Sequence, residues 1–300
     1  MHRAILAPGT CYHVGRLSDL AGRILDGRYQ LLQLIGQGNH GVVYRAVDQV
    51  SRYEVAVKLL RDVEANAEYY VRMVREARAM AALAGTSAVQ VHGFGSDVDG
   101  SFYIVMELLS GMNFEEYLTR LESRGGRLPL PHMIWVLDPI VATLEAAHDR
   151  GIVHRDLKPS NIFLLDAHLG GGVRLMDFGL VKLMGARPLT RQGMVAGSPS
   201  YIAPEAWAGN PTKLDQRIDV YGFAVIVFRV LAASVPFETS DLFEKLRLVT
   251  TGKRPSLRAL RPDLPADIDI WVEQSMAINP EERFTRVRAS WTALRSILRV

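Results

Sequence analysis

The sequence contains almost no cysteine: Cys11 is the only one in 300 residues. A single thiol cannot form an internal disulfide framework, and this scarcity is typical of proteins from a reducing compartment. Cys11 and His13 have the residue types of half a metal site, but no second pair lies near them in the sequence. We therefore expect neither a disulfide scaffold nor a metal site built on these two residues.

The sequence also lacks long apolar runs and a large excess of one charge. The longest apolar stretch, residues 220–228, is far shorter than the roughly 20 residues that a membrane-spanning helix needs. The N-terminus has no sustained apolar region, so we expect no signal peptide, no membrane segment and a soluble, cytoplasmic chain. The formal net charge of +3 gives no support to nucleic-acid binding.

A length of 300 residues suits one large domain or two smaller lobes, and an apolar fraction of 48% is enough for a sizeable core. The hydrophobic patterns predict strands in the first part of the chain and mainly helices afterwards. Strands are expected at 28–47 (two, around a turn), 54–60, 89–94, 102–107 and 173–176, and helices at 65–83, 113–120, 131–150, from 219 onward and at 290–299.

The turn between the first two predicted strands is rich in glycine, with residues 36–41 reading GQGNHG. A GxGxxG pattern alone is weak evidence, because dinucleotide-binding folds share it. In those folds a helix follows the glycines, whereas residues 42–44 here read VVY and favour a strand. In a strand–turn–strand unit, glycines have no Cβ atom, so the backbone of the turn can approach phosphate groups and offer its N–H groups to them.

Three further motifs occur in order along the chain. Residues 154–161 read HRDLKPSN, residues 177–179 read DFG and residues 203–205 read APE. Together they resemble the catalytic loop, the metal-binding triplet and the end of the activation segment of the protein kinase family. Lys158 followed by Pro159 resembles serine/threonine kinases rather than tyrosine kinases. The sequence as a whole is similar to bacterial members of the eukaryotic-like branch of the family.

The resemblance implies an α+β, bilobal protein-kinase fold. In this fold a small N-terminal lobe has an antiparallel β-sheet and one main helix, and a larger C-terminal lobe is mainly helical. We expect the domain at 28–300, with the N-lobe at about 28–107, a hinge at about 107–111 and the C-lobe at about 112–300. ATP would bind between the lobes, and residues 1–27 would be an N-terminal extension. Many bacterial relatives are receptor or multidomain proteins, so the chain could be a fragment of a longer one.

The resemblance also implies the roles of the catalytic-loop residues. Asp156 would orient a hydroxyl group and accept its proton, and Lys158 would steady the charge of the moving phosphoryl group. Asn161 and Asp177 would hold magnesium.

The nucleotide-binding residues follow from the same resemblance. Lys58 would contact the α- and β-phosphates and pair with Glu76. The alternatives are that Lys58 is an ordinary exposed strand lysine and that Glu76 only pairs with Arg72 on a helix surface. The nucleotide-binding set is Gly36, Gln37, Gly38, Gly41, Val43, Ala56, Lys58, Met106, Glu107, Leu109 and Phe163.

A regulatory site is expected in the activation segment, because Arg155 in the catalytic loop is a feature of kinases switched by phosphorylation. Thr190 lies midway along the segment, whereas Ser198 and Ser200 lie in the stretch expected to dock the substrate. The alternative is that Thr190 is a plain exposed threonine. A phosphate on Thr190 would be held by Arg155, Lys182 and Arg72.

Two more residues are expected to support the site. Asp219 would be a costly buried carboxylate unless its oxygens are satisfied, and the resemblance implies that it caps the backbone of the catalytic loop. Arg283, in a motif resembling the late arginine motif of the family, would pair with Glu205.

The leading hypothesis is an ATP- and magnesium-dependent serine/threonine protein kinase acting on a protein substrate. One alternative is a catalytically weak or inactive scaffold that binds nucleotide and partner proteins. Another is a small-molecule phosphotransferase of related fold, but such enzymes lack the full activation segment that ends in APE. The sequence names neither the substrate, the upstream signal nor the oligomeric state.

Overall fold

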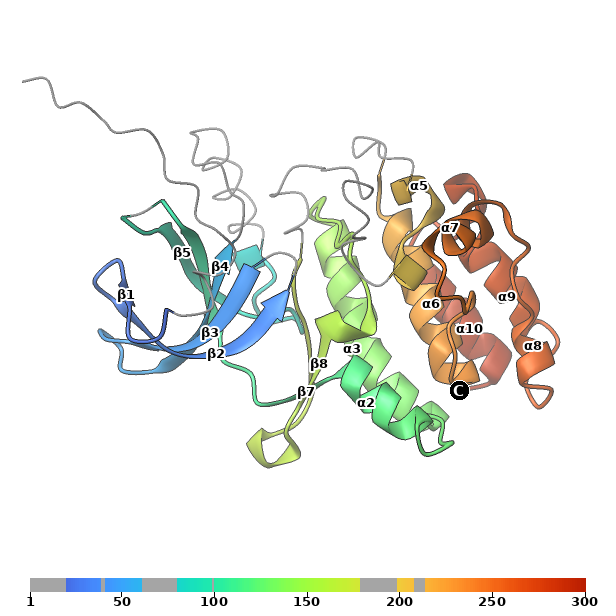
Figure 1. The fold of residues 1–300 in the computed structure, drawn as a ribbon. Helices are drawn as coiled ribbons and strands as arrows, with labels where there is room; N and C mark the ends of the chain where they lie inside the picture. The colour runs from blue at the N-terminus through green and yellow to red at the C-terminus, as the bar shows by residue number, and fades with distance from the viewer. Residues whose placement is uncertain (1–19, 39–40, 61–79, 99, 179–198, 208–213) are drawn as a thin grey trace, which may run out of the picture. The chain divides into compact units, whose positions relative to one another are not determined.

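The structure, a computed structural model, divides into two compact units, and each is described by itself (Figure 1). The first unit comprises residues 1–63 and 93–108, and the second comprises residues 64–92 and 109–300. The helix predicted at 65–83 falls almost entirely outside the described residues. The described residues are 20–38, 41–60, 80–98, 100–178, 199–207 and 214–300.

A six-stranded sheet with the order β1-β2-β3-β4-β6-β5 forms the first unit. The predicted strands around the glycine-rich turn, at 54–60 and at 102–107 are confirmed. β5 begins later than predicted, because the backbone N–H of Val89 donates instead to the carbonyl of Leu175. The strands are β1 Ile24–Leu25, β2 Tyr29–Gly38, β3 Gly41–Asp48, β4 Glu54–Leu60, β5 Val91–Ser96 and β6 Phe102–Glu107.

One face of this sheet forms the core of the first unit. Side chains alternate between the two faces of a strand, so Val42 and Tyr44 of β3 and Val57 and Leu59 of β4 point to the same side and are buried there. The intervening residues of the same strands point to the other face. That second face carries the residues expected to bind nucleotide.

The second unit contains a small sheet with the order β7-β8-β9 and a set of helices. The predicted helices in the described part of the chain are confirmed, and α10 begins earlier than predicted because its apolar face starts at the buried Val287. The strands are β7 Gly111–Asn113, β8 Ile162–Leu165 and β9 Val173–Leu175. The helices are α2 Phe114–Glu122, α3 Leu130–His148, α5 Pro204–Trp207, α6 Arg217–Ala232, α7 Leu242–Thr251, α8 Leu257–Leu260, α9 Ile268–Ser275 and α10 Val287–Leu298, with the 3₁₀ turns η1 Pro159–Asn161 and η4 Pro199–Tyr201.

Helix α6 is the centre of the second unit. It is apolar on all sides and buried over nearly its whole length, as expected for a core helix. It packs against α9, α10 and η4, and Phe223 meets Trp291 of α10 edge to face at a ring distance of 5.7 Å. Within the described ranges, every helix is too short or too polar to cross a membrane.

Candidate active site

The second face of the large sheet brings together the predicted nucleotide-binding residues of β3, β4 and β6. Val43 lies opposite Lys58, and Ala56 lies opposite Met106. Directly opposed residues of antiparallel strands point to the same face, as do residues two apart on one strand. These four side chains therefore share one face. Lys58 is only 5% exposed, so the alternative that it is an ordinary exposed strand lysine is wrong.

The fold requires glycine at only one of the three glycine positions of the turn. Gly41 has φ +147°, and a Cβ there would lie 1.9 Å from the carbonyl oxygen of Leu59, so the fold itself requires glycine. A Cβ on Gly38 would meet nothing within 4 Å, and one on Gly36 would make only an ordinary contact of 3.6 Å with Val43. Packing within the described residues therefore does not require glycine at 36 and 38, where the backbone of β2 is open to a ligand.

The catalytic-loop residues form one hydrogen-bonded cluster in the second unit. The ammonium of Lys158 lies 2.6 Å from Asp156 Oδ2. Asn161 Nδ2 donates to the backbone carbonyl of Asp156 at 2.7 Å and to Oδ2 at 3.2 Å. The turn η1 places Asn161 where it can do so, because the backbone N–H of Asn161, its last residue, donates to the carbonyl of Lys158 at 3.0 Å. The carboxylate of Asp156 is thus oriented from two sides.

His154 links the catalytic loop to the segment that carries Asp177. Its Nε2 lies 2.8 Å from the carbonyl of Met176, which can only accept, so Nε2 carries the proton. Its Nδ1 accepts from the backbone N–H of Asp156 at 3.3 Å, and its ring packs on Phe178 at 4.7 Å. Asp177 has φ +60°, a conformation that costs a non-glycine residue about 1–3 kcal/mol and that surrounding contacts must maintain.

Asp219 supports the loop from helix α6, as expected from the sequence. Its Oδ2 accepts the backbone N–H of His154 at 2.9 Å, and its Oδ1 accepts that of Arg155 at 2.8 Å. His148 Nε2 lies 2.7 Å from Oδ2. Burial alone would raise the pKa of Asp219, but the hydrogen bond from His148 and the neighbouring donors hold this pKa below its ordinary value. The cap on the catalytic loop is therefore a charged carboxylate.

Two features of the loop were not evident in the sequence. A Cβ on Gly222 would lie 3.0 Å from the carbonyl oxygen of Leu157, so glycine lets α6 approach the loop closely. Arg155 has φ +69°, and its buried Nε has no hydrogen-bond partner within the described ranges. A close approach between segments that are distant along the chain leaves no local sequence pattern. A buried hydrogen-bond donor without a partner can likewise be recognised only in a structure.

Asn161 and Asp177 offer the oxygen ligands that magnesium prefers. The amide nitrogen of Asn161 is engaged with Asp156, so its amide oxygen is the atom available to a metal. The described part of the chain contains no group of three or more His, Cys, Asp or Glu side chains suited to a metal ion. Magnesium does not require one, because it commonly binds through one or two carboxylates together with substrate phosphates.

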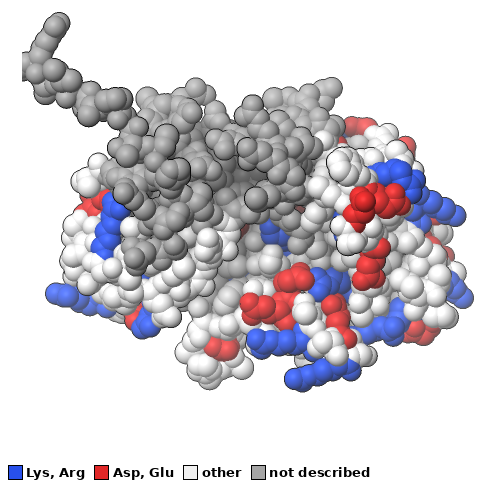
Figure 2. All heavy atoms as spheres, viewed as in Figure 1, with Lys and Arg blue, Asp and Glu red and all other residues white. Residues whose placement is uncertain are grey.

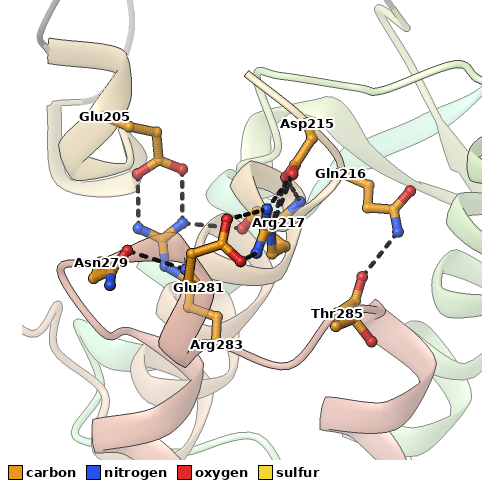
Figure 3. A network of polar contacts seen from close by, with 8 residues as sticks. All are labelled: Glu205, Asp215, Gln216, Arg217, Asn279, Glu281, Arg283 and Thr285. Carbon is orange, nitrogen blue, oxygen red and sulfur yellow. Dashed lines mark hydrogen bonds and ion pairs between the residues drawn. The ribbon is translucent and has the colours of Figure 1, made fainter. Parts of the chain in front are cut away.

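The expected pair between Arg283 and Glu205 is confirmed, and it belongs to a wider network (Figure 3). Arg283 Nη1 and Nη2 each lie 2.7 Å from an oxygen of Glu205 on α5, a bidentate arrangement. Arg217 bonds Asp215 and Glu281 beside it. This network fixes the end of the APE motif onto the helical unit.

The remaining predicted residues divide between the two units. Gln37 lies on β2 and Glu107 at the end of β6 in the first unit, whereas Leu109 and Phe163 belong to the second. Phe163 pairs with Asn113 of β7 and with Arg174 of β9. The predicted residues outside the described residues are Arg72, Glu76, Lys182 and Thr190.

Comparison with known proteins points to one family. Residues 29–292 match the family model described as the protein kinase domain. The chain is 35% identical over 274 residues to the serine/threonine-protein kinase PknA of Mycobacterium tuberculosis, covering 89% of this chain and 61% of the relative. It is 32% identical over 267 residues to the serine/threonine-protein kinase PrkC of Bacillus subtilis, covering 88% of this chain and 40% of the relative. The chain thus spans less than two thirds of the length of these relatives.

A solved structure gives the same result. The crystal structure of the PknI kinase domain of Mycobacterium tuberculosis matches with a TM-score of 0.70 and 27% sequence identity. The match covers 92% of this chain and 98% of that one.

Proposed function

The chain belongs to the protein kinase family, and from this we propose that it is an ATP- and magnesium-dependent serine/threonine protein kinase. It transfers the γ-phosphoryl group of ATP to the hydroxyl of a protein serine or threonine. The observation that carries the proposal is the cluster in which Lys158 and Asn161 orient the carboxylate of Asp156.

The transfer step uses the residues of that cluster. The hydroxyl oxygen of the acceptor forms a bond to the γ-phosphorus, the bond from that phosphorus to the bridging oxygen of ADP breaks, and the hydroxyl proton passes to Asp156. Such proton transfer contributes about 10²–10⁴-fold to rate. The ammonium of Lys158 lies 2.6 Å from Asp156 and supplies positive charge beside the moving phosphoryl group. Asn161 and Asp177 would hold magnesium, which would supply positive charge to neutralise the phosphates.

The sheet face of the first unit binds the nucleotide. Val43 and Ala56 offer an apolar surface to the adenine, and Met106 lies next to Ala56 in the register. The buried Lys58 provides the charge for the α- and β-phosphates. The backbone of Glu107 and Leu109 binds the adenine edge, Phe163 contacts the ring, and the backbone of residues 36–38 covers the phosphates.

We also propose that the kinase activates itself by phosphorylating Thr190. The support within the described residues is Arg155, whose buried Nε has no partner there and whose position directly precedes Asp156. A phosphate carries close to two negative charges and forms strong bonds with guanidinium groups. Lys182 and Arg72 would complete its binding site and so order the activation segment.

The proposed domain extends over residues 28–300, and the proposed role is in signalling. The single cysteine agrees with a cytoplasmic location, because structural disulfides are rare in that compartment. Magnesium and ATP are the expected cofactors, and a protein with an accessible serine or threonine is the expected partner.

A transfer assay with ATP labelled on the γ-phosphate tests the proposal. The purified chain is incubated with magnesium and a protein acceptor, and the labelled amino acids are identified after hydrolysis. We expect phosphoserine or phosphothreonine, and we expect none with Asp156→Asn in the same time. Tight ATP binding without any transfer by the unchanged chain would instead indicate a nucleotide-binding scaffold.

A further inference from the structure

Arg229 is a charged residue near the end of the core helix α6, and no other charged residue follows Asp219 in this helix. Its side chain is only 9% exposed. Nη1 donates to both carboxylate oxygens of Glu115 at 2.7 Å, and Nε and Nη2 donate to the two oxygens of Glu122 at 3.0 Å each. One guanidinium therefore joins two carboxylates of helix α2.

The third partner of Arg229 is a residue of the turn η4. Nη1 of Arg229 also donates to the hydroxyl of Tyr201 at 3.0 Å, and Tyr201 is 8% exposed. The neighbouring Ser200 accepts a bond of 2.9 Å from the ammonium of Lys245 on α7. Arg229 is thus the point at which α6, α2 and η4 meet.

Only arginine can make this set of contacts. Its planar fork presents five N–H donors, whereas the ammonium of lysine is a single point of charge. Burial raises the pKa of Tyr201 to about 12, so the hydroxyl keeps its proton at neutral pH. Burial alone would lower the pKa of Arg229, but its bonds to Glu122, Glu115 and Tyr201 raise it, so the guanidinium stays charged.

The balance of charge around Tyr201 depends on the same residue. Glu115 and Glu122 are 36% and 20% exposed, so both can interact with a ligand at the surface as well as with Arg229. In Figure 2, acidic and basic side chains lie intermingled over the visible face of the helical unit. Removing Arg229 would leave two carboxylates beside Tyr201 without their buried counter-charge.

We propose that Arg229 is a positioning residue of the protein-substrate site: it fixes Tyr201, and through it η4, in the conformation in which the protein substrate docks. This inference rests on the proposed kinase function and on the expectation from the sequence that the stretch containing Ser200 docks the substrate. Arg229 does not touch the reacting atoms. Its loss therefore affects the affinity for the protein substrate rather than the binding of ATP.

The test separates the Michaelis constants of the two substrates. Arg229→Met should raise KM for a protein acceptor about tenfold, because it removes charge-assisted bonds, and leave KM for ATP within about twofold. Arg229→Lys keeps the charge without the fork and should give an intermediate KM. Peptides with basic residues should lose less affinity than neutral ones in Arg229→Met, because two carboxylates are left unpaired.

Tyr201→Phe removes only the hydroxyl and identifies the contact through which Arg229 acts. Tyr201→Phe should raise KM for the protein acceptor. The double variant Arg229→Met with Tyr201→Phe should have no higher KM for the protein acceptor than Arg229→Met alone. Additive losses would overturn the proposed coupling. If the thermal transition shows that Arg229→Met does not fold, KM for the protein acceptor is compared in Arg229→Lys and Tyr201→Phe instead.

Arg286→Met is the matched control. Arg286, which directly precedes α10, also bonds two carboxylates, Glu145 and Asp149, and these belong to α3 and the residue that follows it rather than to the α2, α6 and η4 cluster. We expect both KM values to stay unchanged. The proposal is overturned if Arg229→Met leaves KM for the protein unchanged, or raises KM for ATP equally. Failure of the unchanged chain to transfer phosphate at all would instead overturn the proposed function.

Discussion

His148 and Asp219 form a buried pair, with His148 Nε2 and Asp219 Oδ2 2.7 Å apart and both side chains at most 1% exposed. The same carboxylate accepts the backbone N–H groups of His154 and Arg155. The conformation of the catalytic loop therefore depends on one charged group of the core helix. Its neighbour Arg155 has a left-handed backbone, which needs such support.

Asp219→Asn is expected to destabilise the protein and reduce phosphate transfer together. The amide keeps the shape of the carboxylate but removes its charge. It also places an N–H group where the carboxylate accepted hydrogen bonds from His148, His154 and Arg155. Leaving a buried hydrogen-bond donor unsatisfied costs about 1–3 kcal/mol, and three donors point at this carboxylate. Urea denaturation measures the free energy of unfolding. Asp215→Asn is the control: Asp215 is 50% exposed, so its loss should cost no more than about 1 kcal/mol, and an equal cost would contradict the role of Asp219.

The stability difference between the unchanged chain and Asp219→Asn should depend on pH. The pKa of Asp219 is lowered in the folded state, so its stabilising effect is fully present above the pKa of the unfolded chain, about 3.9, and is lost as pH falls further. We expect a constant difference between pH 5 and 8 that shrinks below about pH 4. Urea titrations across this range provide the check, and a difference that grows on acidification would show that Asp219 is uncharged in the fold.

Gly38 and Gly41 should respond differently to alanine. Gly41→Ala places a Cβ 1.9 Å from the carbonyl oxygen of Leu59 at φ +147°, and should cost at least about 2 kcal/mol of stability. Gly38→Ala meets nothing within 4 Å, so stability should stay within about 0.5 kcal/mol while KM for ATP rises. Thermal melting and ATP titration measure the two effects. An unchanged KM for ATP in Gly38→Ala would contradict the close approach of phosphate.

Thr190 is predicted to carry a phosphate after incubation with ATP and magnesium, and Thr190→Ala is predicted to lower activity toward other proteins. A charge-assisted bond contributes about 1.5–3 kcal/mol, and shifting a segment from about 1% to about 99% ordered takes about 5.5 kcal/mol. Two or three bonds, from Arg155 and its expected partners, are therefore sufficient. Mass spectrometry identifies the site, and full activity with Thr190 unmodified would show that no such switch is needed.

Much of the fold could be predicted from sequence because the relevant patterns are local. The alternation at 54–60 and the valines after the glycine turn specify strands, and β4 has the predicted bounds. The position of Asp219 beneath the catalytic loop was also predicted, but from the resemblance to protein kinases; an apolar helix shows only that the carboxylate needs partners.

The contacts of Arg229 could not be predicted in this way. Its partners Glu115 and Glu122 lie more than a hundred positions away in the sequence, and no periodicity relates them. The close approach of Gly222 to Leu157 is likewise a matter of three-dimensional packing. Motifs that resemble those of protein kinases therefore predicted the catalytic residues, whereas the structure was needed to show what supports the segments around them.

Turnover by Asp156→Asn tests the central claim most directly. Single-turnover transfer from labelled ATP measures the rate, and equilibrium titration measures the dissociation constant for ATP. We expect kcat to fall by about 10²–10⁴-fold, the usual contribution of a general base, with the dissociation constant little changed. Asp166→Asn, which alters a partly exposed carboxylate bonded to Ser110 in the same unit, should change neither. Intact turnover with weakened ATP binding in Asp156→Asn would contradict the account.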